Sequence, residues 1–448
     1  MATKRNIGCA QAVEQNDTIT ITGTVTASTD TVSVTVDNKT CTVTAGATID
    51  TTAEMASAIA EALIATQHDE QYFTADMTIN AGGYEYPQFR DMAVSVSGSV
   101  VTLVSKTPGV PYVVTVGDTG TGVATLASVT TATGPWHFDA AENWEGGVAP
   151  ATGDVLVYDG QSSSTYYALD NTVADLNLER RNSFQGHIGL NEINATHGTF
   201  TYPEYRQTKL DLPITVTSGT QAHVLGEADS PIVAAGHTYI DMGTVSGSTQ
   251  SVTINDVPAT SEVARDAVLI AGGNDLQIIA YSGSVGVGLN VADNATILLS
   301  LELLELPGKA KPPKVTLKSQ VTFSGASDTV RIDTGTLSVE TGTPGVVYEM
   351  YGGTLIQQQS INTINIRPGA TVKHIFGNVT TLVIFGGGEF DASTGQAFTI
   401  TNATFYSGFI YRELGLATYS NGIDFVGCTP ADGTFVVAAS KTWTPTAI

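Results

Sequence analysis

The chain of 448 residues is poor in cysteine, histidine and positive charge. Its three cysteines, Cys9, Cys41 and Cys428, are too few and too widely spaced for a disulfide framework or a paired-cysteine metal site. We therefore expect free thiols in a reducing compartment. The chain also contains no phosphate-binding loop, dinucleotide fingerprint or calcium loop, so we expect no metal and no other cofactor.

Positive charge is scarce: 19 basic residues face 43 acidic ones, a formal net charge of −24. Binding to a nucleic-acid backbone needs clustered Lys and Arg, and anionic membrane surfaces attract basic segments in the same way. We expect neither nucleic acid nor a membrane as a partner. The same charge favours solubility and repulsion between unassembled copies.

Long apolar runs are missing as well. No window approaches the roughly 18 apolar residues that a membrane-spanning helix requires, and the first residues lack the apolar core of a secretory signal. We expect a chain that is made in the cytoplasm, although its composition is typical of extracellular β proteins. Particles that assemble inside a cell and leave it by lysis reconcile the two observations.

What the sequence does contain is a glycine repeat. Gly335, Gly352, Gly369 and Gly386 recur at equal intervals along the chain. Two apolar series run at nearly the same step: Leu337, Leu355, Val372 and Phe390, and then Val330, Val347, Ile364, Leu382 and Ile400. A fixed short period is typical of repeat architectures. With strand-forming composition it predicts a β-solenoid in which each glycine marks a tight corner where a side chain would clash.

The part before the repeat predicts a short arm and an α+β domain. Residues 1–16 are polar and without periodicity, and we expect either a disordered terminus or a peptide that orders on a neighbouring subunit. Residues 17–132 alternate apolar and polar positions as half-buried strands do. Within them, Thr51 and Glu54 fit a capping box for a helix. The apolar stripe of that helix consists of Met55, Ala58, Ile59, Ala62 and Leu63.

Four segments of this domain carry a resemblance. They are residues 32–36 (VSVTV), the alanine-rich helix at 53–65, residues 100–104 (VVTLV) and residues 109–113 (GVPYV). In this order they resemble a small α+β domain that recurs in virion proteins of tailed bacteriophages. The resemblance covers about a quarter of the chain, and it implies a docking domain within a virion.

Residues 133–160 predict a junction. Trp136 and Trp144, followed by Gly146-Gly147 and Pro150, look like the start of the solenoid domains of large surface and virion proteins. The first coil of a solenoid has an open edge that must be covered, and two tryptophans supply a wide apolar lid. We expect them to cap the solenoid; a platform for stacking sugars is the alternative.

The solenoid is expected over residues 161–430, with a C-terminal tail at 431–448 that offers Trp443 for packing. One run, residues 297–306, fits a helix as well as a strand. The segment 307–314 interrupts the pattern and concentrates positive charge at Lys309, Lys311, Lys314 and nearby Lys318. We expect a solvated loop there, or a contact between subunits.

A solenoid raises the prospect of a polysaccharide-cleaving tailspike. Glycoside hydrolysis needs two carboxylates about 5–9.5 Å apart, which here means positions about one coil apart. By this spacing Asp391 follows His374, while Glu302 and Glu305 lie close together in an apolar run. No pair of carboxylates emerges, so we expect no catalytic site; these four residues are the ones to replace first in a test of the alternative.

The sequence as a whole predicts a mainly β protein: an N-terminal α+β domain followed by a right-handed parallel β-helix, which resembles the pectin-lyase-like solenoids. The resemblance implies a bacteriophage virion structural protein, homotrimeric and bound to other virion proteins. We expect a decoration protein on the capsid exterior, attached through its N-terminal region. The alternatives are a tail fibre or tailspike that binds host surface glycan, and a bacterial surface adhesin.

Overall fold

The computed structural model describes residues 2–37, 39–68, 78–79, 87–167, 176–181, 183–184, 186–189, 205–209, 220–227, 237–242, 249–255, 268–288, 296–305, 312–318, 321–324, 329–340, 346–437 and 446–447. The chain is mainly β and forms two compact units. The solenoid unit comprises Met1–Ile7, Trp144–Gly146 and Pro150–Ile448, and the inserted unit comprises Gly8–Asn143 and Gly147–Ala149. The first strand of the chain therefore belongs to the solenoid, and the other unit is inserted after it.

The inserted unit contains two antiparallel sheets, each with four described strands. One has the order β6 (Met92–Ser97), β7 (Val100–Ser105), β2 (Asn16–Gly23) and β9 (Gly122–Thr130). The other has the order β5 (Thr78–Ile79), β4 (Lys39–Thr44), β3 (Thr31–Val36) and β8 (Val114–Thr119). Strands β6 and β7 are joined by a tight turn in which Gly98 has a φ of +58°.

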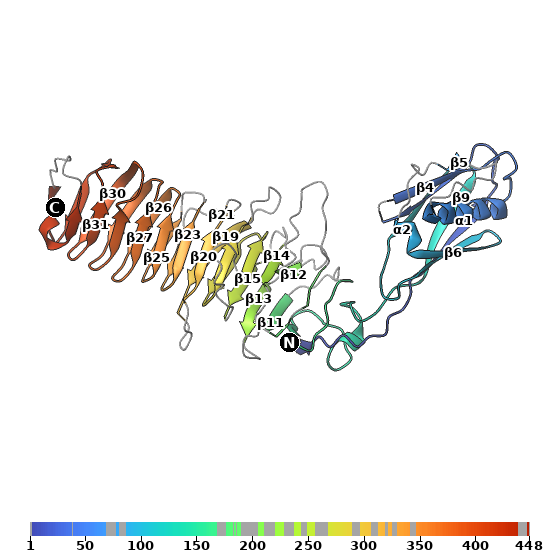
Figure 1. Cartoon of the computed structure of the whole chain (residues 1–448), viewed down its shortest axis with the longest axis horizontal. Helices are drawn as coiled ribbons and strands as arrows, with labels where there is room; N and C mark the ends of the chain where they lie inside the picture. Colours follow the sequence, from blue (N-terminus) through green and yellow to red (C-terminus); the bar gives the residue numbers. More distant parts are fainter. Residues whose placement is uncertain are drawn as a thin grey trace. The chain divides into compact units, whose positions relative to one another are not determined.

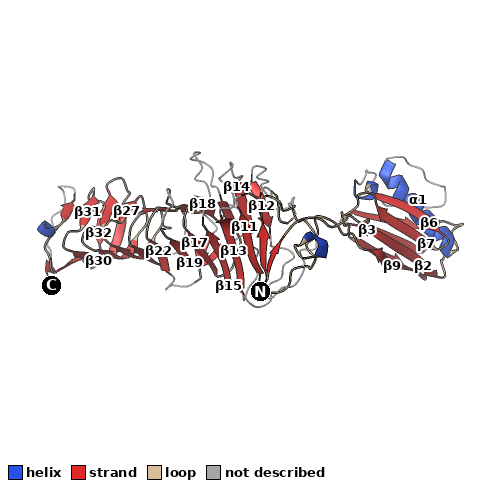
Figure 2. Ribbon diagram, turned by 90° about the horizontal axis from the view of Figure 1, so that it is seen from below, coloured by secondary structure: helices blue, strands red, loops and turns tan. Residues whose placement is uncertain are grey.

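Helix α1 (Thr52–His68) packs against strands of both sheets and against the short helix α2 (Pro87–Arg90) (Figure 2). The capping box at its start is confirmed: the Glu54 amide donates to Thr51 Oγ1 at 3.2 Å, and the Thr51 amide donates to Glu54 Oε2 at 3.1 Å. The predicted apolar stripe of α1 is buried in the core of the unit. The Asp30 carboxylate links the segment between β2 and β3 to the start of β9, because it accepts hydrogen bonds from the amides of Thr26 and Gly122, each at 2.9 Å.

The solenoid consists of two parallel sheets whose strands follow one another along the unit in chain order (Figure 1). The longer sheet has the order β1 (Thr3–Arg5), β10 (Val155–Tyr158), β11 (Leu176–Arg181), β13 (Thr220–Glu227), β15 (Thr249–Ile254), β17 (Leu276–Ala280), β19 (Thr296–Leu303), β22 (Thr329–Ile332), β24 (Val347–Met350), β26 (Ile361–Ile366), β28 (Val379–Ile384), β30 (Phe398–Tyr406), β33 (Ile423–Val426) and β35 (Thr446–Ala447), with β21 (Val321–Phe323) beside β19 and β32 (Ala417–Tyr419) beside β30.

The shorter sheet has the order β12 (Tyr205–Lys209), β14 (His237–Asp241), β16 (Val268–Ala271), β18 (Ser284–Val287), β20 (Lys314–Leu317), β23 (Thr336–Val339), β25 (Thr354–Gln357), β27 (Thr371–His374), β29 (Glu389–Ala392), β31 (Ile410–Glu413) and β34 (Thr434–Val436). Two single-turn 3₁₀ helices, Ala141–Asn143 and Pro430–Asp432, complete the described elements. The predicted β-solenoid is thus confirmed over about residues 155–436.

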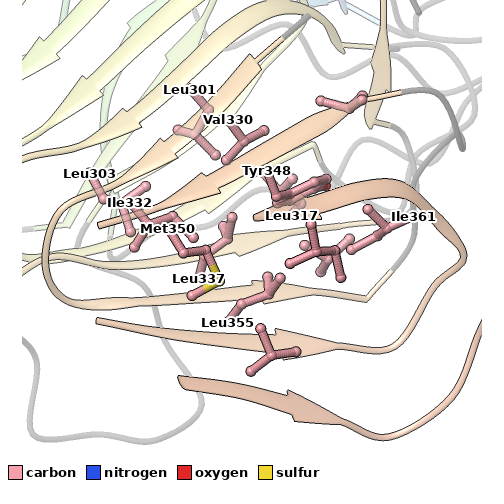
Figure 3. Close-up of a cluster of buried hydrophobic side chains, with 14 of the residues drawn as sticks. Leu301, Leu303, Leu317, Val330, Ile332, Leu337, Tyr348, Met350, Leu355 and Ile361 are labelled. Atoms are coloured by element: carbon pink, nitrogen blue, oxygen red, sulfur yellow. The ribbon is translucent and has the colours of Figure 1, made fainter. Parts of the chain in front are cut away.

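The core lies between the two sheets, and the buried residues of each strand stack on the equivalent residues of the next coil (Figure 3). The first predicted apolar series is in register throughout: Leu337 pairs with Leu355, Leu355 with Val372, and Val372 with Phe390. The second series is wrong at two members. Tyr348, not Val347, is aligned with Val330, and Ala403, not Ile400, with Leu382. The physical reason is that successive coils differ in length, which displaces the aligned positions from a constant period.

The first residues of the N-terminal arm are neither disordered nor dependent on a neighbouring subunit for order, because they pair within the chain. Strand β1 pairs in parallel with β10, and the Val155 amide donates to the Ala2 carbonyl at 2.8 Å. Asp154 Oδ1 accepts the Ala2 amide at 2.8 Å, and the Asn6 amide donates to the Val157 carbonyl at 3.0 Å. The physical reason is the edge of β10, whose backbone groups would otherwise remain without strand partners.

Two further expectations are corrected at the C-terminal side. The run at 297–306 does not form a helix: residues 296–303 are strand β19, because Leu298, Leu301 and Leu303 face the core. The solenoid also extends beyond residue 430, since β34 pairs with β31 and β35 pairs with β33. Trp443 lies outside the described residues.

Candidate interaction surface

The four repeat glycines lie where the chain turns towards the strands of the shorter sheet. A Cβ added at Gly335 would lie 2.1 Å from the Pro313 carbonyl oxygen. At Gly352 and Gly386 it would lie 2.3 Å from the carbonyl oxygens of Asp333 and Ser407, respectively. Gly369 has open space around its Cα but a φ of +83°, and Gly335 has a φ of +81°. Each position therefore excludes a side chain through space, backbone angle or both.

These glycines do not form one register column. The pairing of Thr336 with Thr354 places Gly335 next to Gly353, and the Gly369 amide donates to the Gly387 carbonyl at 3.0 Å. Longer and shorter coils alternate in this part of the sheet. Glycines at a constant spacing therefore do not stay aligned with the same position of each coil. The repeat marks a common corner and not a single stack.

Of the two junction tryptophans, Trp144 belongs to the solenoid unit and Trp136 to the inserted unit. Trp144 is fully buried and contacts Tyr158 edge to face at 5.9 Å, and Tyr158 contacts Phe184 at 5.2 Å. The chain changes unit at Asn143, whose Nδ2 donates to the Gly134 and His137 carbonyls at 2.7 Å each. Those bonds keep the segment that carries Trp136 within the inserted unit.

The lysine cluster is described only in part. Lys314 is exposed at the start of β20 and lies in register between Ser284 and Thr336. Lys318 is half-buried just beyond the end of the same strand. Lys309 and Lys311 lie outside the described residues, so the expected intersubunit contact there stays a prediction.

Three outward carboxylates, Glu302, Glu349 and Asp391, lie beside basic residues of neighbouring coils. Glu302 pairs in register with Arg331, and Arg331 pairs with Glu349. In the shorter sheet Asp391 lies between Lys373 and Arg412. Coils are about 4.8 Å apart, so alternating signs replace repulsion by attraction along each column.

This arrangement corrects the expected Asp391–His374 pair, because Asp391 follows Lys373 and not His374. Burial alone would raise the pKa of Asp391, but hydrogen bonds from Ser393 and the charges of Arg412 and Lys373 hold it below its usual value. Glu305 is exposed beyond the end of β19. The four residues considered for glycan cleavage therefore do not converge.

His374 is fully buried in the core. Its Nε2 donates to the Gly377 carbonyl at 2.8 Å, while Nδ1 has no hydrogen-bond partner among the described residues. The ring lies 4.0 Å from the Phe398 ring and 5.7 Å from the Phe390 ring. Burial lowers the pKa of His374, although the hydrogen bond to Gly377 opposes the shift. A neutral, enclosed imidazole is a core residue and not a surface acid or base.

A cavity of about 190 Å³ lies in the inserted unit beside Tyr112. The Tyr112 hydroxyl donates to the Leu103 carbonyl at 3.0 Å, and burial, with the nearby Asp17 charge, raises the pKa of that hydroxyl. Asp37 at the cavity wall already accepts the Val113 amide at 3.0 Å. Tyr112 and Asp37 thus hold backbone groups of the strands and loops around the cavity.

The most distinctive surface of the solenoid is a column of side chains at the C-terminal ends of the strands of the longer sheet, on the last strand residue or the residue after it. We call it the aromatic stripe: Tyr351, Arg367, Phe385, Tyr406 and Val426. The residue before each member is aligned with its equivalent on the next coil, so that each of five successive coils carries one stripe residue. The stripe therefore runs along the solenoid axis.

Neighbouring members of the aromatic stripe stack on one another. The Arg367 guanidinium carbon lies 5.0 Å from the Tyr351 ring centroid and 4.8 Å from that of Phe385. The rings of Phe385 and Tyr406 are 4.9 Å apart and inclined by only 9°. Each cation–π or aromatic contact is worth about 0.5–1.5 kcal/mol.

Carboxylates neutralise the arginines at this corner. Arg331, whose guanidinium carbon lies 5.2 Å from the Tyr351 ring centroid, makes two hydrogen bonds of 2.8 Å to Asp333. The hydrogen bond and charge of Asp333 raise the pKa of Arg331. Arg367 lies 3.5 Å from Glu349, whose other oxygen accepts Asn365 Nδ2 at 2.6 Å.

The aromatic stripe was not predicted from the sequence. The intervals between its members all differ, so no constant period connects them. Aligning each coil on its last buried residue (Met350, Ile366, Ile384, Phe405 and Phe425) would have exposed the column, because every stripe residue directly follows one of these.

Among the described residues there is no group of three or more His, Cys, Asp or Glu side chains placed to hold a metal ion. Within the same part of the chain, neither length nor apolar content qualifies any helix as a membrane span. Comparison with protein-family models, with curated proteins and with solved structures gave no match.

Proposed function

We propose that this chain is a non-enzymatic structural protein of a tailed-bacteriophage particle. One observation carries the proposal. Apolar side chains fill most of the interior of the described coils, and on the outside charges of opposite sign alternate from coil to coil within a column. Such a surface is built for rigidity. The parallel crossovers favour right-handed coils, as in about 98% of such connections.

Within the particle, the role that fits best is decoration and stabilisation of the capsid exterior. The inserted unit attaches to other virion proteins, and the solenoid projects or bridges neighbouring subunits. The assembly is a homotrimer, because closed symmetry buries apolar flanks that a single solenoid leaves in water. The support is the resemblance of the α+β segments together with the acidic composition of the chain.

Removal of the gene from the producing phage tests this function. Particles without the chain are expected to assemble and to adsorb to host cells, but to lose their genome at a lower temperature than complete particles. Purified chain added back restores the heat resistance. Particles that keep full heat resistance and no longer adsorb would instead indicate a tail fibre or tailspike.

Glycan cleavage is examined separately with purified chain and host surface polysaccharide. No release of oligosaccharide is expected, with or without replacement of Glu302, Glu305, His374 and Asp391. Release that disappears on replacing these residues would overturn the non-enzymatic assignment. A chain recovered from the bacterial surface, in cells without phage particles, would support an adhesin.

A further inference from the structure

We propose that the aromatic stripe is the seam along which copies of this chain associate side by side, the solenoids running parallel. The inference rests on the homotrimer proposed above and names the surface that forms it. It commits to a second copy of the chain as the occupant of the stripe.

Part of the aromatic stripe is exposed to solvent and is therefore available for contact with another copy of the chain. Tyr351 is 48% exposed and Val426 is 43% exposed, while Phe385 and Tyr406 are half-buried. These residues belong to one continuous column and are not scattered singly over the surface. A contiguous apolar patch of this kind is characteristic of interaction sites.

The orientation of the rings argues against a glycan as the occupant. Sugars stack on the open face of an aromatic ring, but here each ring has at least one face against a neighbour along the axis. Arg367 lies over both Tyr351 and Phe385, and Phe385 stacks on Tyr406. A ring whose face is taken by a neighbour offers its edge to a partner, a chemistry that suits the packing of protein side chains.

Charge favours another copy of the chain. A net charge of −24 makes copies repel each other over most of their surface. At the stripe, Arg331 is paired with Asp333 and Arg367 with Glu349, so the corner is close to neutral. Two copies meet the least repulsion where each is neutral and apolar.

The stripe is also ordered before it binds. Stacking between coils already fixes its long side chains, so association loses little side-chain entropy. Four steps of about 4.8 Å make it roughly 20 Å long. Tyrosine and arginine, the residue types it offers, are enriched among those that dominate interface energetics.

The test compares wild-type chain with Tyr351→Asp and with a matched control, Thr380→Asp. Thr380 is exposed and lies on β28, the strand that Phe385 follows, but it is outside the stripe. Native mass spectrometry and sedimentation over a concentration series measure assembly. Wild type and Thr380→Asp should be trimers, and Tyr351→Asp should weaken association by about 30-fold or more.

A second measurement keeps the test informative if Tyr351→Asp folds poorly. Thiols are introduced separately by Tyr351→Cys and Thr380→Cys, each in a Cys9→Ser background, and reacted with a maleimide under native conditions. The thiol at position 351 should react much more slowly in the trimer than at monomeric dilution, whereas that at 380 should react equally in both states.

Three outcomes would contradict the proposal, each in a different way. Trimeric Tyr351→Asp together with rapid labelling at position 351 overturns the seam but leaves the trimer standing. A wild-type chain that is monomeric at every concentration overturns the trimer and the seam together. Saturable binding of a host oligosaccharide that Tyr351→Asp abolishes would assign the stripe to a glycan instead.

Discussion

At Gly335 the backbone angle and the surrounding space both exclude a side chain. Its φ is +81°, and an added Cβ would lie 2.1 Å from a backbone oxygen that cannot move without shifting the preceding coil. Gly369, at the same corner, has almost the same angle, +83°, but no atom within 4 Å of the added Cβ. The two positions therefore separate backbone strain from steric clash.

We predict that Gly369→Ala lowers the free energy of unfolding by about 1–2 kcal/mol, the cost of a left-handed backbone. Gly335→Ala should lower it by about 3 kcal/mol or more, because the clash with Pro313 adds to the same strain. Urea unfolding of the two variants beside wild type measures the difference. Equal losses would show that the Gly335 corner relaxes freely.

His374 should make stability depend on pH. Its pKa in the folded chain lies below the value of about 6.5 expected when unfolded. Above about pH 6.5 the imidazole is neutral in both states, and the contribution of buried His374 to the free energy of unfolding is fully present. As the pH falls from about 6.5 towards the folded pKa, the unfolded state binds a proton that the folded state refuses, and stability drops by up to about 1.4 kcal/mol per pH unit.

The comparison is between wild type and His374→Gln, since glutamine retains a donor for the Gly377 carbonyl. Urea unfolding at steps between pH 8 and pH 5 should give a steeper loss of stability for wild type. Parallel pH profiles would mean that the imidazole is protonated in the folded chain without penalty.

At the scale of elements, strand β1 closes the first edge of the longer sheet. Its pairing with β10 is supplemented by the Asn6 side chain, whose Oδ1 accepts the Ser163 amide at 3.0 Å. The side chain of Arg5 lies 3.5 Å from Asp159. The backbone pairing matters more than this ion pair, because partly exposed ion pairs contribute about 1 kcal/mol or less.

Deletion of residues 2–5 should accelerate hydrogen exchange at the amides of β10 by about 10-fold or more, because its edge becomes exposed to water. Arg5→Gln retains the strand and should leave exchange nearly unchanged. Mass spectrometry of exchanged peptides covering residues 155–158 reads out both. Unchanged exchange after the deletion would mean that β1 does not protect this edge.

The elements that the sequence predicted well are those with a local signal. The capping box of α1 and the series Leu337, Leu355 and Val372 follow from contacts within one helix turn or from a repeat of nearly constant length. Strand β1 had no such signal, since it pairs with a strand that follows only after the whole inserted unit. The aromatic stripe was not predicted because its coils differ in length, although each of its residues follows a buried strand residue.

At the scale of the whole molecule, the chain begins in the solenoid, forms a second unit and returns. Each unit has an apolar core of its own. The inserted unit begins and ends close together, since the Gly8 amide donates to the Asn143 carbonyl at 3.4 Å. Adjacent ends are what allow one domain to be inserted into another.

We predict that the solenoid folds without its insertion. Replacing residues 8–143 with two glycines should leave a soluble β protein whose exchange protection at β24–β28 matches that of the full chain. Residues 8–143 expressed alone should unfold cooperatively. An aggregated or unprotected solenoid would show that the two units depend on each other for folding.

We propose above all that the chain is an architectural component of a virion shell. Gold-labelled antibody against the purified chain, applied to intact particles and imaged by electron microscopy, tests it most directly. If the proposal is right, the label is distributed over the whole capsid surface. Label confined to the tail, or no label on any particle, would contradict it.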